Sequence, residues 1–170
     1  MKRGRTLFIG VIGALLAVGI ERLAGLVAGR DADLCLLVGA VLTRSVTVSS
    51  TLLGCAGQLV VAVVSAYIYA FVFEHVTRRA GALVGFVIGL GHVIVAGLVV
   101  GVMPGDRLME AGVMPPGAFM EYRGAVVLIG FLLAHLAFGT FVGAAYGATM
   151  HRASAPAPRW VERWRRPSGV

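Results

Sequence analysis

Four long apolar runs constrain this chain more than any other feature of its sequence. They cover residues 7–27, 51–73, 80–103 and 124–147. A helix rises about 1.5 Å per residue, so each run is long enough to cross a hydrocarbon core of about 30 Å. Backbone polar groups inside lipid must be satisfied within the segment itself. We therefore predict an all-α fold, a polytopic transmembrane bundle of four membrane-spanning helices.

The composition excludes an ordinary soluble protein. The chain is 58% hydrophobic and 14% charged, whereas an average soluble domain is about 45–50% apolar and about 25% charged. A net charge of +7 does not indicate nucleic-acid binding, because the basic residues lie at the ends of the apolar runs. The two cysteines, Cys35 and Cys55, lie in or beside apolar segments without the spacing of a metal site, so neither a metal nor a disulfide is expected.

The pattern divides the chain into a membrane domain, residues 1–150, and a basic tail, residues 151–170. Within the membrane domain, residues 31–44 hold an apolar stretch too short to cross, so we expect this segment to be interfacial or re-entrant. The tail has an alternating Pro/Ala linker followed by two tryptophans among arginines. Its expected lipid-anchoring residues are Trp160, Arg163, Trp164 and Arg166. Docking to a partner protein is the alternative for this tail.

The distribution of basic residues predicts the orientation. They gather at the N-terminus, in the second connection and in the tail, at Lys2, Arg3, Arg5, Arg78, Arg79, Arg152, Arg159, Arg163, Arg165 and Arg166. Under the positive-inside rule, these three regions face the cytoplasm. We therefore expect a multi-pass protein of a bacterial inner membrane with both termini cytoplasmic. The first run also resembles a signal peptide, but no small-residue cleavage site precedes Glu21, so we expect an uncleaved helix.

Glycine recurs at every fourth residue in parts of the last two runs. The glycines are Gly81, Gly85, Gly89, Gly139, Gly143 and Gly147. Such stripes let membrane helices approach closely. Consecutive spans run antiparallel, so the position numbers of two residues at equal depth add up to a constant. Pairing the first glycine of one span with the last of the other, and so on inward, gives the same sum for all three pairs. We predict a glycine-zipper contact between the third and fourth spans.

His92 and His135 fall within one residue of the same depth in that register, about halfway along their spans. Ionisable residues inside a membrane are rare and suggest a functional site. Three interpretations stay open: a structural hydrogen-bonded pair, a relay for protons or metal ions, and ligation of haem or another tetrapyrrole. The glycine stripes argue against a porphyrin between the helices. Candidate hydrogen-bond partners for the imidazoles lie on the second span, at Gln58, Ser65, Tyr67 and Tyr69.

Glu21 and Arg22 lie in the outer third of the first span. We expect a hydrated interfacial pair there, with Arg22 reaching the headgroups. A role for Glu21 on an ion path is the alternative. No residue set for nucleophilic catalysis accompanies the histidines, so no catalytic residues and no enzyme activity are predicted.

Three motifs resemble small, uncharacterised bacterial membrane proteins with four helices. They are Gly-Leu-Gly-His at residues 89–92, Met-Pro-Pro-Gly-Ala-Phe at residues 114–119, and the run from His135 to Gly147. The resemblance covers residues 80–147 and implies the four-helix fold, but no activity.

The first functional expectation is a non-enzymatic accessory or scaffold subunit of a larger inner-membrane assembly, because most residues serve packing or anchoring. Its partners would be membrane lipids and other membrane subunits, or further copies of the chain. The alternative is a small oligomeric transporter of protons, metal ions or small solutes that uses His92 and His135. A water-filled cavity reaching His92 would favour the transporter, and a dry seam would favour the scaffold. A subunit that binds haem or a pigment is the third class.

Overall fold

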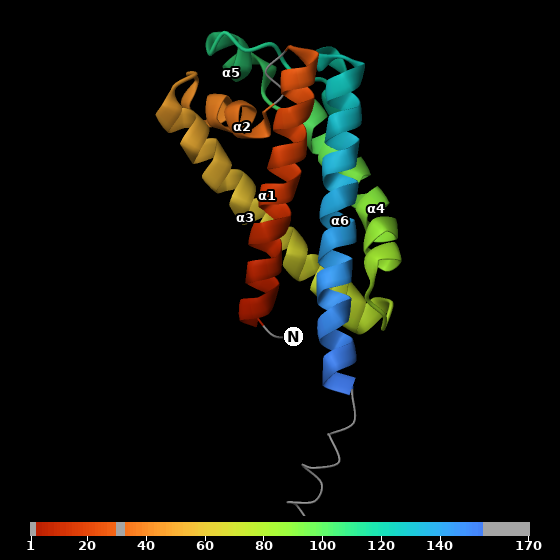
Figure 1. Ribbon diagram of the computed structural model, residues 1–170. Coiled ribbons are helices and arrows are strands. Elements are labelled where there is room, and N and C mark those ends of the chain that lie inside the picture. Colours follow the sequence, from red (N-terminus) through yellow and green to blue (C-terminus); the bar gives the residue numbers. More distant parts are fainter. Residues whose placement is uncertain (1–2, 30–32, 155–170) are drawn as a thin grey trace, which may run out of the picture.

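The computed structural model describes residues 3–29 and 33–154, and its regular elements are all helical (Figure 1). They are α1 (Arg3–Ala28), α2 (Leu34–Thr43), α3 (Val48–Phe71), the π-helical η1 (Val72–Val76), α4 (Ala82–Gly101), α5 (Gly105–Glu110), the 3₁₀-helical η2 (Ala118–Arg123) and α6 (Ala125–Ser154). The expected all-α bundle is confirmed. The tail residues Trp160, Arg163, Trp164 and Arg166 lie outside the described residues.

Four helical segments are long and apolar enough to cross a membrane, as expected of an integral membrane protein. They are Arg3–Ala28, Val48–Val76, Ala82–Gly101 and Ala125–Ala148. Exposed Leu, Ile, Val and Phe side chains are distributed along all four. Such apolar surfaces suit contact with lipid chains. Because lipid is as apolar as these side chains, packing between the helices depends on shape and polar contacts.

The bundle is a row of three helices crossed by a fourth (Figure 1). Helix α6 packs extensively against α1 on one side and α4 on the other, and α3 packs against α1. Helix α3 crosses α1 obliquely, so it diverges from α1 near one end of the bundle. We call that end, with α2, α5 and η2, the loop end. The opposite end, where α1 begins and α6 ends, is the termini end.

Short elements close the loop end. Helix α2 has only ten residues and packs against α3 and α5. Its side chains Leu34, Leu37 and Ala40 join a buried cluster with Leu108 of α5 and Phe131 of α6. The segment at residues 31–44 therefore contains a short helix packed into the loop end of the bundle, and this helix is too short to span a membrane.

The segment before α6 also packs inward. Phe119 and Met120 adopt left-handed backbone conformations, with φ of 53° and 67°. This turn buries Met120 and brings the Phe119 ring against the backbone of Gly97, where a Cβ atom would lie 2.6 Å from the Phe119 Cγ atom. The connection is thus fixed to α4 by a ring that only a glycine accommodates.

Helices α4 and α6 meet backbone to backbone. A Cβ atom built on Gly85 would lie 2.8 Å from the Gly143 Cα atom, and one on Gly139 would lie 2.9 Å from the Gly89 Cα atom. At the termini end, a Cβ atom on Gly147 would lie 3.2 Å from the Gly81 nitrogen. Contacts this short leave no room for side chains, so the two helices pack at the closest distance that backbones allow. We call this contact the glycine seam.

The seam predicts a contrast between two glycines of the same helix. Gly85→Ala should lower the free energy of unfolding by about 1–3 kcal/mol, because the added methyl group overpacks a backbone contact. Gly91→Ala is the matched control, since a Cβ atom there would meet nothing within 4 Å. Alanine improves helix propensity, so Gly91→Ala should leave stability equal or slightly higher. Unfolding in detergent micelles, followed by circular dichroism, measures both, and equal stabilities would contradict the close seam.

Candidate functional site

Polar side chains from all four spanning helices line one cavity of about 40 Å³ inside the bundle. They are Glu21 of α1, Gln58 and Ser65 of α3, His92 of α4 and His135 of α6. The other lining residues are small or apolar: Ala14, Ala17, Val18, Val61, Ala62 and Phe138. A cavity needs about 10–15 Å³ and two or more polar partners to hold a water molecule. This cavity satisfies both conditions, so it can be hydrated.

The two histidines contact each other. Their ring centroids are 5.2 Å apart, and the rings meet edge to face at 79°. The Nδ1 atom of His135 lies 2.9 Å from the carbonyl oxygen of Phe131. A carbonyl can only accept, so Nδ1 of His135 donates this hydrogen bond. In the neutral ring, Nε2 then remains an acceptor, which is the arrangement that a proton-accepting imidazole requires.

Tyr69 of α3 contacts His92 of α4. Its hydroxyl lies 3.4 Å from Nδ1 of His92, and its ring is only 2% exposed. The rings of Tyr69 and His92 both contact Phe138 edge to face. A Cβ atom on Gly139 would lie 2.8 Å from the Tyr69 hydroxyl. The glycine seam therefore also provides the space in which this hydroxyl reaches the histidine.

Glu21 is the most buried charged residue of the site, at 4% exposure. Among the residues that the structure describes, no hydrogen-bond or ion-pair partner reaches its carboxyl group. Instead the side chain lines the cavity that also holds the two histidines. Glu21 therefore does not form the expected interfacial pair with Arg22, and the only water within its reach would be water in the cavity. Adjacent residues of a helix point in different directions, so Arg22 can face the outside of the bundle while Glu21 faces inward.

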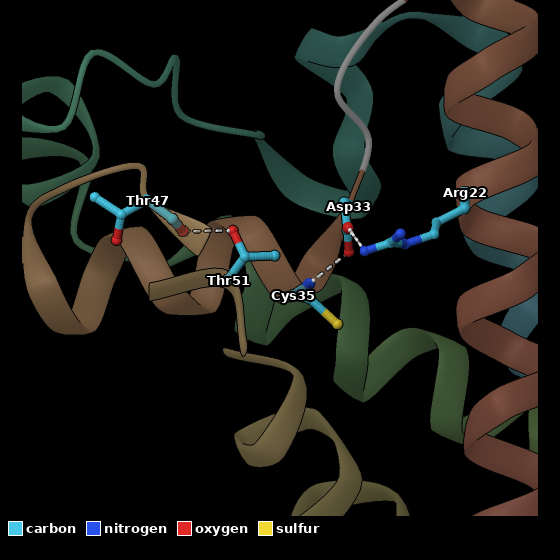
Figure 2. A network of polar contacts seen from close by, with 5 residues as sticks. All are labelled: Arg22, Asp33, Cys35, Thr47 and Thr51. Carbon is cyan, nitrogen blue, oxygen red and sulfur yellow. Dashed lines mark hydrogen bonds and ion pairs between the residues drawn. The ribbon is translucent and has the colours of Figure 1, made fainter. Parts of the chain in front are cut away.

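Arg22 has its own partner in Asp33 (Figure 2). The guanidinium of Arg22 lies 2.7 Å from the Asp33 carboxylate. Asp33 is also the N-cap of α2, where its other carboxylate oxygen accepts a hydrogen bond of 2.8 Å from the backbone of Cys35. Sequence reasoning missed this link between α1 and α2. An acidic residue directly before a short apolar run is the capping signal that could have revealed it.

The remaining polar candidates lie away from the cavity. The Tyr67 hydroxyl donates to the backbone oxygen of Arg3 at 2.9 Å, near the termini end. Tyr146 donates a hydrogen bond to Glu74, also near that end. Cys35 and Cys55 are free thiols that form no disulfide, and both border a second, apolar crevice beside the cavity. Of the four α3 side chains considered as histidine partners, Tyr69 is the one in hydrogen-bond distance of an imidazole.

The geometry limits what the histidines could hold. Their rings are in direct contact, and the cavity beside them measures about 40 Å³. A porphyrin therefore does not fit between the two rings. Among the side chains that the structure describes, in residues 3–29 and 33–148, no three His, Cys, Asp or Glu side chains are grouped so that they could hold a metal ion. The site as built has a carboxyl group, two imidazoles, an amide and a hydroxyl around a space of water size.

The ring contact predicts an energetic coupling between the two histidines. In a double-mutant cycle, His92→Ala and His135→Ala should be non-additive by about 0.5–3 kcal/mol, because each removes the other's neighbour. His75 provides the control, since its ring stacks on Phe71 instead. His92→Ala and His75→Ala should add within about 0.5 kcal/mol. Unfolding free energies in micelles give both couplings, and additivity of the first pair would contradict the contact.

Comparison with known proteins assigns no family to the chain. No protein-family model matches it, and no curated protein or solved structure matches it either. The chemistry of the cavity is therefore the feature that indicates a function. Its distinguishing feature is a buried carboxyl group that shares a water-sized space with two histidines.

Proposed function

We propose that the chain is a small, non-enzymatic transporter that moves protons across the membrane through the cavity between α1, α3, α4 and α6. Glu21, His92 and His135 are the groups that bind the proton. The single observation that carries this proposal is the inward-facing carboxyl group of Glu21, which is buried in the cavity of the two histidines and has no hydrogen-bond or ion-pair partner among the described residues.

The residue types suit proton exchange. Carboxyl and imidazole groups both gain and lose protons, and histidine does so near neutral pH. Gln58 and Ser65 do not ionise in this range, but both can hydrogen-bond to water. Water in the cavity would connect the carboxyl group to the imidazoles, so a proton can pass between groups that do not touch.

The energetic cost of Glu21 supports a functional role. Burying an unpaired ionised carboxylate in an apolar medium is very costly, and ionisable residues inside membranes are rare for this reason. Arg22, its neighbour, is paired with Asp33. If Glu21 served only packing, a similar ion-pair partner or replacement by an apolar side chain would make the folded protein more stable. A proton on Glu21 removes the charge, so proton binding relieves the cost.

The first expectation from the sequence was an accessory or scaffold subunit. That role needs only close packing, and it predicts a dry seam at the histidines. The glycine seam is indeed close, but on the side toward α1 and α3 the histidines border a cavity. This observation favours proton transport over a scaffold. Four helices enclose little space, so we propose that the protein works as an oligomer of identical chains surrounded by lipid.

Proton uptake by proteoliposomes tests the proposal. The protein is reconstituted into vesicles, a potassium gradient with valinomycin sets a voltage, and a pH-sensitive dye inside reports proton entry. We expect voltage-driven uptake well above that of protein-free vesicles. Glu21→Gln should slow it by about tenfold or more, because the amide keeps the shape but cannot carry a proton.

The control is a second glutamate-to-glutamine change. Glu121 is exposed on η2 outside the cavity lining, so Glu121→Gln should keep the wild-type rate within about twofold. Circular dichroism and size-exclusion chromatography check that both variants are folded. Uptake no faster than in protein-free vesicles would overturn the proposal in favour of a scaffold. Equal rates for Glu21→Gln and wild type would remove Glu21 from the path.

We propose further that the termini end faces the cytoplasm of a bacterial cell. Arg3, Arg5, Arg78 and Arg79 lie at that end. At the loop end, by contrast, acids compensate two arginines, since Arg22 pairs with Asp33 and Arg44 lies 3.2 Å from Glu110. Excess positive charge on one side is typical of the cytoplasmic face of an inner-membrane protein.

Cysteine labelling tests this orientation. Met114 is exposed at the loop end and Arg79 at the termini end. In cells with a permeable outer envelope, a membrane-impermeant maleimide should label Met114→Cys and leave Arg79→Cys unlabelled until the cells are lysed. The unsubstituted protein controls for its two native cysteines. The opposite labelling pattern would reverse the proposed orientation.

A further inference from the structure

A second, larger space lies beside the polar cavity, on the side of α1, α2 and α3. It is an apolar crevice of about 240 Å³, bordered by Cys55 and Leu59 among others. Three residues, Ala14, Val18 and Gln58, line both the crevice and the cavity. The two spaces are therefore neighbours, one with polar groups in its lining and one apolar, and these three side chains form the wall between them.

The crevice faces the lipid. At its border, Leu15 is 65% exposed and Leu59 is 38% exposed, and both belong to spanning helices. Exposed apolar side chains on such helices lie against acyl chains in a membrane. Helix α3 diverges from α1 toward the loop end (Figure 1). A molecule dissolved in the bilayer could thus enter the crevice from the side, next to the polar cavity.

We propose that the two neighbouring spaces together bind a small lipophilic primary amine, with the side chains of the shared wall moving apart to admit it. Its ammonium group would sit in the polar cavity at Glu21, and its short hydrocarbon chain would lie in the crevice. The inference deepens the proposed function and rests on it, because it assigns the substrate that competes with the proton for the same carboxyl group.

The chemistry of the cavity selects a cation. The residues that line it include a carboxyl group, an amide and a hydroxyl, which can all accept hydrogen bonds, and no Lys or Arg is among these lining residues. An ammonium group has three donors and a charge opposite to that of a carboxylate. An anionic head would meet the carboxyl group without compensation. A neutral alcohol would make fewer and weaker hydrogen bonds in the same place.

The dimensions select a small molecule. A polar space of about 40 Å³ admits a compact ammonium group more readily than a bulky quaternary one. The crevice of about 240 Å³ is smaller than the roughly 300–1,000 Å³ of pockets that enclose drug-sized ligands. One short alkyl chain therefore suits it better than the two long chains of a membrane lipid.

Proton and amine would bind alternately. When the carboxyl group of Glu21 carries a proton, the buried site is neutral. When the ammonium ion binds, the proton leaves the carboxyl group to water and the carboxylate pairs with the ammonium. No covalent bond of the amine changes. The net charge of the site is the same with the proton bound as with the ammonium ion bound, because one positive charge leaves as the other enters.

Binding of radiolabelled n-octylamine to the protein in lipid nanodiscs tests the proposal, with empty nanodiscs subtracted for partition into lipid. Saturable binding is expected, and Glu21→Gln should weaken it about 10- to 100-fold through loss of a charged hydrogen-bond partner. Glu121→Gln should bind as the wild type does. Unlabelled n-octanol and octanoate, matched in chain length, should compete poorly.

A second variant tests the crevice without touching the charge. Ala56 borders the crevice and does not line the polar cavity. Ala56→Phe should fill the space and weaken octylamine binding by about tenfold, by occupying the volume that the alkyl chain needs. Equal binding by the wild type and Glu21→Gln, or competition by octanol as strong as by octylamine, would overturn the proposal and leave non-specific partition into the crevice as the explanation.

The two proposals fail separately. Proton uptake by vesicles without amine, together with absent octylamine binding, would overturn the amine site and keep proton transport. Saturable, Glu21-dependent octylamine binding without proton uptake would overturn proton transport and keep an amine-binding site.

Discussion

The backbone contact between α4 and α6 is the constraint on which the rest of the bundle depends. Because glycine hydrogens are all that separates the two helices, their relative depth is fixed by the positions of Gly85, Gly139 and Gly143. That depth places the imidazoles of His92 and His135 side by side. Gly139 also leaves room for the Tyr69 hydroxyl. A sliding of either helix by one turn, about 5.4 Å, would separate the histidines.

A second constraint comes from charge at the loop end. Asp33 caps α2 and binds Arg22, so it ties the end of α1 to the short helix beside it. This link fixes the direction in which α1 presents its polar residues. With Arg22 directed toward Asp33, Glu21 lies on the inner side of the helix and reaches the cavity. The surface ion pair and the buried carboxyl group are therefore two consequences of one rotation of α1.

The site places a polar environment and an apolar environment next to each other in a small volume. Polar groups surround a space of water size, and the adjoining crevice is apolar and faces lipid. Gln58 lies at the boundary between them. Such an arrangement follows from the oblique course of α3, which is close to α1 where a Cβ atom on Gly10 would lie 3.1 Å from the Val63 Cα atom, and separates from it toward the loop end. Residues of α1 and α3 thus border both the cavity and the crevice.

The sequence alone determined the local features of this protein. Run length and hydropathy predict the four spans, and the spacing of Gly81 to Gly89 and Gly139 to Gly147 predicts which helices approach and at what depth, because helical rise converts position into distance. Only the tertiary structure decided how each helix is rotated about its axis. Apolar residues surround α1 on every side, so its sequence does not say which face is buried, and Glu21 lies inside the bundle instead of at the interface beside Arg22. The convergence of Glu21, Gln58 and Ser65 on the histidines depends on contacts between distant helices, and no local pattern encodes those.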